Sequence, residues 1–238
     1  MRRSAAVSLL AFLAPAAIAA ISVAYAENVG EATRVQTFAY QTPPQSNRTP
    51  LYRLDPVVRN ATLQTVPSGS LEVKFTDGSL LTLGGNSTIV VDNYVYNQGG
   101  AGQQTLKMTR GVFRFVSGTI PKDQVHLQTP MVTIGIRGTV VKSSHDDTTG
   151  KDVVFFEHGE GNVTVNSTGQ NFPMHQGDMI EINPNGGTTG PQHKPWLAGD
   201  PAVDYGMGPF NHQDGGPGAG STGGDGAGSA GGAGRGNN

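Results

Sequence analysis

The sequence predicts an all-β protein, either a β-solenoid-like stack or a rolled sandwich of short strands, followed by a disordered glycine-rich C-terminal tail. Three observations support this fold class. Apolar and polar residues alternate along short segments, as in half-buried strands, and turn-forming residues separate these segments. Of the 238 residues, 35 are glycine and 15 are proline, which suits a turn-rich β protein. The 3.6-residue period of an amphipathic helix is not convincing anywhere.

The first 26 residues are predicted to be a cleaved signal peptide. Two arginines precede an alanine-rich apolar segment at residues 7–21, and Ala24-Tyr25-Ala26 provides the small-x-small cleavage pattern. An uncleaved anchor helix is the alternative, because the stretch is just long enough to span a bilayer. Pro15 and the weak contribution of alanine to insertion favour cleavage. We therefore expect a periplasmic protein (or a secreted or cell-surface one) with no stable membrane span after cleavage.

The mature chain is expected to begin with an extended lead-in at residues 27–53, which is polar, contains prolines and has one candidate strand near residues 34–40. The β domain is predicted to cover residues 54–183. Its first clear strand is residues 71–75, and the Asp77-Gly78 pair that follows predicts a type I′ hairpin turn. Further strands are expected at residues 80–83, 89–96, 105–108, 112–116, 125–127, 129–141, 153–157, 163–165 and 179–182.

The long segment at residues 129–141 is expected to be the central strand of this domain. Gly135 and Gly138 interrupt it, and glycine inside a strand commonly marks a bend, a bulge or the close approach of another backbone. Arg137 lies between them as the one charged residue of the segment. Its side chain must either reach solvent or find a carboxylate or carbonyl partner, because an unpaired buried charge is very costly.

Thr129-Pro130 followed by Thr-Ile-Gly-Ile-Arg-Gly-Thr at residues 133–139 resembles the signature of FecR-like domains, the periplasmic sensory family named after the iron-dicitrate sensor. Blocks at residues 75–83, 92–96 and 110–118 fit the same pattern in the expected order, so the resemblance covers residues 54–183. It implies a β-solenoid-like stack of short strands that receives a signal from an outer-membrane transporter. Family members of the usual kind also carry a cytoplasmic anti-sigma segment and a transmembrane helix. A signal peptide at the start of this sequence departs from that pattern and puts direct control of a sigma factor in doubt.

Gly135, Arg137 and Gly138 are the candidate binding residues. Arg137 could recognise a ligand carboxylate, as on a citrate-like chelate, through the fork of its guanidinium group. Alternatively, it could be an internal clamp that pairs with Glu157, Glu160 or backbone carbonyls. The clamp is the favoured interpretation, because a signature shared by a family more often serves the common fold than one ligand.

No catalytic residue, metal site or cofactor is predicted, and the chain is not expected to be an enzyme. It has no cysteine, which excludes disulfides and thiolate ligands. Neither a nucleophile-elbow motif nor a phosphate-binding glycine loop is present. Its six histidines include no pair at helical ligand spacing and are expected to be structural or solvent-exposed. The net charge of −2 gives no reason to expect nucleic-acid binding.

Beyond the β domain we expect a Pro/Gly-rich linker at residues 184–214 and a disordered tail at residues 215–238, which is too poor in apolar residues to form a core. The predicted function is an exported, non-catalytic sensory or protein-binding module. It would contact an envelope protein through exposed strand edges or loops, by strand addition or side-chain contact. The alternative is a structural or surface-matrix protein, with the β domain as anchor and the glycine-rich tail as spacer.

Overall fold

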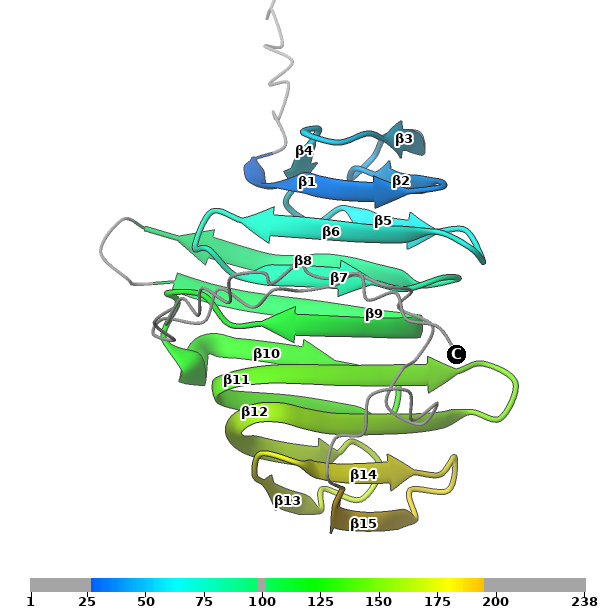
Figure 1. The fold of residues 1–238 in the computed structure, drawn as a ribbon, viewed down its shortest axis with the longest axis vertical. Coiled ribbons are helices and arrows are strands. Elements are labelled where there is room, and N and C mark those ends of the chain that lie inside the picture. The colour runs from blue at the N-terminus through cyan, green and yellow to red at the C-terminus, as the bar shows by residue number, and fades with distance from the viewer. Residues whose placement is uncertain (1–26, 98–101, 195–238) are drawn as a thin grey trace, which may run out of the picture. The chain divides into compact units, whose positions relative to one another are not determined.

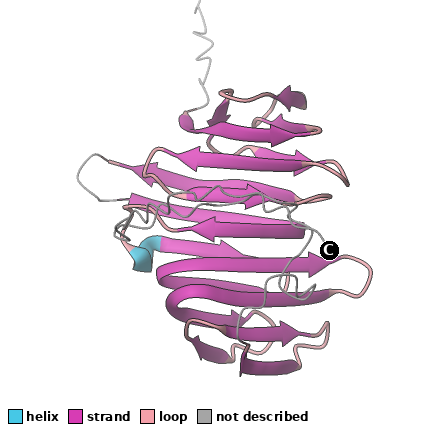
Figure 2. Cartoon of the chain, in the orientation of Figure 1, coloured by secondary structure: helices cyan, strands magenta, loops and turns pink. Residues whose placement is uncertain are grey.

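The computed structural model describes residues 27–97 and 102–194, and within these residues the chain is all-β apart from one short 3-10 turn, η1 (Lys122–Gln124) (Figure 2). The predicted fold class is confirmed. Nothing in the described part of the chain is a helix long and apolar enough to span a membrane. The predicted signal peptide, residues 195–214 of the predicted linker and the glycine-rich tail lie outside the described residues.

Fifteen strands of the described chain join one hydrogen-bonded sheet (Figure 1). In chain order they are β1 (Asn28–Gln36), β2 (Ala39–Thr42), β3 (Thr49–Leu51), β4 (Pro56–Val58), β5 (Thr62–Thr65), β6 (Ser70–Phe75), β7 (Leu80–Leu83), β8 (Thr88–Tyr96), β9 (Gly102–Val116), β10 (Val125–Gln128), β11 (Val132–Asp146), β12 (Lys151–Val165), β13 (Asn171–Met174), β14 (Asp178–Ile182) and β15 (Thr188–His193).

The sheet is rolled, because its three longest strands pair with different neighbours along their two halves. The first half of β9 pairs with β8, and its second half pairs with β7. The first half of β11 pairs with β10, and its second half pairs with β9. One half of β12 pairs with β14 and the other with β13. Each long strand therefore belongs to two faces of the roll, and apolar side chains fill the space between these faces.

The core contains residues from both faces of the roll. Phe75 of β6 and Tyr94 of β8 stack with their ring centroids 5.3 Å apart, although the two strands are not hydrogen-bonded to each other. Phe113 and Phe115 of β9 are buried, as their alternation in the sequence predicts. The main core is therefore one cluster of side chains from strands far apart in the chain, and Phe155 and Met179 form a second, smaller cluster.

The boundaries of the domain differ from those expected. β1 pairs with β6, and Val29 and Ala32 are buried in the core, so residues 27–53 belong to the folded sheet and are more than a lead-in. A register shift between Ala32 and Arg34 breaks the two-residue period of β1, and this irregularity hides the strand from a search for alternation. At the other end, β15 continues the sheet beyond residue 183.

The turn after β6 is also different from the expected type I′ turn. Such a turn needs positive φ at both central residues. Only Gly78 has it, at 83°. The Gly78 amide donates to the Phe75 carbonyl and the Phe75 amide to the Ser79 carbonyl, which is the pattern of a longer loop closed by a left-handed glycine. Asp77 turns inward and accepts hydrogen bonds from the amide and the hydroxyl of Ser79, so its side chain supports this loop.

The four edge strands of the described sheet each carry one proline. β3, β4, β13 and β15 pair on one side only, and they contain Pro50, Pro56, Pro173 and Pro191. The other strands contain none. Proline lacks the amide hydrogen that a strand ladder needs, so these edges resist the addition of another strand.

Candidate functional site

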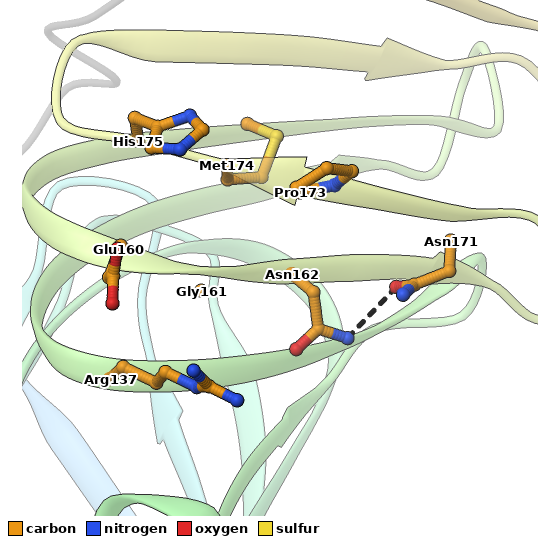
Figure 3. Close-up of a pocket in the computed structure, with 8 residues that line it drawn as sticks. All are labelled: Arg137, Glu160, Gly161, Asn162, Asn171, Pro173, Met174 and His175. Atoms are coloured by element: carbon orange, nitrogen blue, oxygen red, sulfur yellow. Dashed lines mark hydrogen bonds between the residues drawn. The ribbon is translucent and has the colours of Figure 1, made fainter.

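A surface pocket of about 350 Å³ lies where β11, β12 and edge strand β13 meet (Figure 3). It contains the central arginine of the sequence signature. Its lining residues are Arg137, Glu160, Gly161, Asn162, Asn171, Pro173, Met174 and His175. The volume is within the range of small-ligand sites. Because both polar and apolar side chains line it, the pocket can bind a ligand that has hydrogen-bond acceptors and an apolar part.

Glycines allow β11 and β12 to form the floor of this pocket. A Cβ atom on Gly161 would lie 2.2 Å from the carbonyl oxygen of Gly135, too close for any other residue without movement of the backbone. A Cβ atom on Gly135 would lie 2.6 Å from Oδ1 of Asn162. Gly135 is in a regular stretch of the ladder, opposite Asn162 and His126. Its role is therefore close approach, one of the uses expected of it, and it makes no bend.

Gly138 does mark a bend. The register between β11 and β12 shifts between Arg137 and Val140, and Gly138 has a φ of 65°. A Cβ atom on Gly138 would lie 2.5 Å from Nζ of Lys122, so the ammonium group lies directly over the glycine. Lys122 and Arg137 thus bring two positive charges to the same bend.

The side chain of Arg137 is exposed, and it forms neither a hydrogen bond nor an ion pair with any of the described residues. Glu160 is opposite it in the β11–β12 ladder. Glu157, the first of the expected clamp partners, is instead bound by Arg114 at 2.8 Å and approached by Lys142 at 3.8 Å. Burial would raise the pKa of Glu157, but the hydrogen bond and charge of Arg114, together with Lys142, hold it below its usual range. The expected clamp between Arg137 and Glu157 is therefore not formed.

Two asparagines form an ordered polar wall of the pocket. Nδ2 of Asn162 donates to Oδ1 of Asn171 at 2.9 Å, and the hydroxyl of Thr164 donates to the same oxygen at 3.1 Å (Figure 3). With its oxygen engaged twice, the amide group of Asn171 is held in one orientation. Its Nδ2 makes no hydrogen bond to the described residues and remains available as a donor.

His175 lies at the rim of the pocket, with 71% of its side chain exposed. Its Nδ1 is 3.4 Å from Oδ2 of Asp178, and Nδ1 of His193 is 3.4 Å from the other oxygen of that carboxylate. These residues do not make a metal site, since no group of three or more suitable side chains in the described ranges could hold an ion.

The sequence indicated only part of this site. The signature identified Gly135, Arg137 and Gly138, which the structure places at or beside the pocket. Two strands were expected at residues 153–157 and 163–165, but the structure has the single strand β12 there, which includes residues 159–162. Asn171 and Pro173 gave no signal, because their role depends on pairing between β12 and β13. The pairing of Asn162 with Pro173 is a tertiary contact, and local sequence patterns do not predict it.

Residues 61–171 match the family model described as FecR protein. Two crystal structures of a protein from Parabacteroides distasonis ATCC 8503, proposed to be an anti-sigma factor, resemble the chain with TM-scores of 0.45 and 0.44 and sequence identities of 12% and 14%. Each alignment covers 54% of this chain and 57% of the other, so the chain spans little more than half the length of these proteins. No curated protein shows a significant match to the sequence.

Proposed function

We propose that the protein, whose residues 61–171 match the FecR family model, is an exported, non-catalytic sensory module that binds its partner through the pocket between β11, β12 and β13. The observation that supports this proposal most strongly is the side chain of Arg137, which is unpaired among the described residues. A cation of the family signature lies in a pocket without a hydrogen-bonding or ionic partner among the described residues. A purely structural arginine is normally paired, whereas one that serves recognition must be available to the ligand.

The edges of the sheet support recognition by side chains. Strand addition needs a row of free amide and carbonyl groups along an edge. Proline interrupts this row in each of β3, β4, β13 and β15. Of the two modes expected from the sequence, side-chain contact is therefore the better supported, and the pocket is the place where it would occur.

Export follows from the proposed signal peptide at residues 1–26. The mature protein would then begin at Glu27, one residue before β1. Intact-mass measurement of the protein purified from the cell envelope tests this step. A mass that includes residues 1–26 would contradict it.

Photo-crosslinking in the cell of origin tests partner binding at the pocket. A photoreactive amino acid is placed at Pro173, an exposed residue of the pocket rim, and, as the matched control, at Asn47 in the exposed loop between β2 and β3. We expect a discrete adduct from position 173 that disappears when Arg137→Ala is added, and no such adduct from position 47. Equal adducts from both positions, or none from position 173, would refute the proposal.

A further inference from the structure

We propose that the pocket between β11, β12 and β13 binds a carboxylate group, with the guanidinium of Arg137 as the main donor and the amide of Asn171 as the second. This inference rests on the proposed function, because it names the ligand class of the same pocket.

Positive charge near the bend of β11 favours an anionic ligand. Arg137 lines the pocket, and it is not bonded to a carboxylate of the described residues. Nζ of Lys122 lies beside the neighbouring Gly138 and adds a second positive charge near this bend. The planar guanidinium group presents two parallel N–H donors, which match the two oxygens of a carboxylate. A ligand carboxylate would supply the anionic partner that Glu157 gives to Arg114 elsewhere in the sheet.

The contact between Asn162 and Asn171 orients a second donor for such a ligand. Asn162 and Thr164 both donate to Oδ1 of Asn171, which fixes the plane of its amide group. The remaining Nδ2 hydrogens are donors, and an acceptor such as a carboxylate oxygen is the group that they can bind. A donor that is already oriented loses little conformational freedom when the ligand arrives.

Glu160 limits the charge of the ligand. This residue lines the pocket and is opposite Arg137 in the ladder, so a second anion placed there is repelled. A single carboxylate that pairs with the guanidinium is accommodated better than a phosphate dianion. Glu160 also provides a means of testing the electrostatics, since its removal should strengthen the binding of an anion.

The volume of the pocket and its apolar side limit the size and kind of ligand that it can hold. A volume of about 350 Å³ holds a small organic acid or the last residue of a peptide. Pro173 and Met174 give the pocket an apolar side, on which the body of such a ligand could lie. The carboxylate could therefore come from a free acid or from the C-terminus of a partner chain.

The test is a titration of the isotope-labelled mature protein, followed by nuclear magnetic resonance. The probes are butyrate, acetyl-Ala-Ala-Phe with a free C-terminus, the same peptide with an amidated C-terminus, and inorganic phosphate. We expect shifts of the amide signals of Gly161, Asn162 and Asn171 with at least one carboxylate probe. The amidated peptide should bind about tenfold more weakly than its acid, because it lacks the charge that pairs with Arg137. Binding of butyrate alone identifies a free acid, and binding of the free peptide alone identifies a chain terminus.

Three variants make the result specific. Arg137→Gln should weaken carboxylate binding about tenfold, and Glu160→Gln should strengthen it severalfold. Arg59→Gln is the control, an exposed arginine of the β4–β5 turn whose partner is Glu27, and it should leave binding unchanged. Equal binding of acid and amide, tighter binding of phosphate, an equal loss in the Arg59 variant, or no binding by any carboxylate overturns the inference. If the carboxylates fail to bind while the crosslink from position 173 forms, only the ligand class is wrong and the partner-binding function stands.

Discussion

Nε of Arg114 donates a 2.8 Å hydrogen bond to Glu157, and only 11% and 15% of the two side chains are exposed. The pair joins β9 to β12, with Lys142 of the intervening β11 beside it. This contact is the internal clamp of the sheet. Glu157 is therefore engaged by Arg114 and Lys142 and does not pair with Arg137.

Arg114→Ala should therefore destabilise the fold. Removal of one partner leaves the Glu157 carboxylate nearly buried without its main donor, and such losses cost about 3–5 kcal/mol. Urea denaturation of the purified mature protein measures this change. The matched control is Arg59→Ala, which breaks an exposed ion pair with Glu27 and should cost about 1 kcal/mol or less. Equal losses in the two variants would show that the Arg114 pair is no clamp.

Thr129→Val should be destabilising by about 1–3 kcal/mol, because it leaves buried polar groups unsatisfied. The Thr129 hydroxyl donates to the carboxylate of Asp152, which is fully buried, and accepts from the Val132 amide at 3.0 Å. Burial raises the pKa of Asp152 in spite of this donor and of His145. The control is Thr133→Val, whose hydroxyl binds an exposed asparagine and should cost about 0.5 kcal/mol. Thermal unfolding of both variants decides the question, and a Thr129 variant as stable as the control contradicts the expectation.

Gly118→Ala should lose about 1–3 kcal/mol through overpacking. An added Cβ atom would lie 2.5 Å from the carbonyl oxygen and Oδ2 of Asp77 and from the Ser79 amide, so the hairpin loop would have to move. At Gly187, the nearest atom to an added Cβ is a side-chain oxygen at 3.1 Å, and Gly187→Ala should change stability little. Differential scanning calorimetry compares the two. If Gly118→Ala has the melting temperature of the wild type, the loop moves to accept the added methyl group without loss of stability.

The stability of the fold should fall between about pH 10 and pH 12 because of Tyr94. Burial raises the pKa of Tyr94 to about 12, and the nearby Asp77 carboxylate adds to this rise. The folded state holds the phenolic proton that the unfolded chain releases near pH 10, so the stabilising contribution is complete below pH 10 and disappears as the pH rises through the folded pKa.

Absorbance titration of the tyrosines, together with urea denaturation at several alkaline pH values, measures this effect. In Tyr94→Phe the loss over this range should be smaller, because the late-titrating phenol is absent. If the wild type and Tyr94→Phe show the same late phase in their alkaline titration curves, the shift of Tyr94 is refuted.

The sequence predicted the segments that alternate regularly, such as β6 and the second half of β9, because a two-residue period shows directly in the residues. It did not predict β1, where a register shift disrupts the period, or the unbroken course of β12 through Gly159 and Gly161. Local patterns record the propensity of a segment, and these two strands are defined by partners distant in the chain.

Contacts between distant segments also limited how much of the pocket could be predicted from the sequence. Arg137 was identified from its signature, but Glu157, one of its expected partners, is bound by Arg114, a residue of another strand. Nothing in the sequence singles out Pro173, because its place beside the pocket depends on β13 being an edge strand paired with β12. Which acidic residue lies near which arginine therefore depends on the pairing of strands that are distant in the chain.

The most direct measurement of the central claim is the stability and binding of Arg137→Ala, determined on the same preparation. We predict a free energy of unfolding within about 0.5 kcal/mol of the wild type, because the side chain is exposed, together with loss of the crosslink from position 173. A loss of several kcal/mol with the crosslink retained would show that Arg137 maintains the fold and that the pocket is not a recognition site.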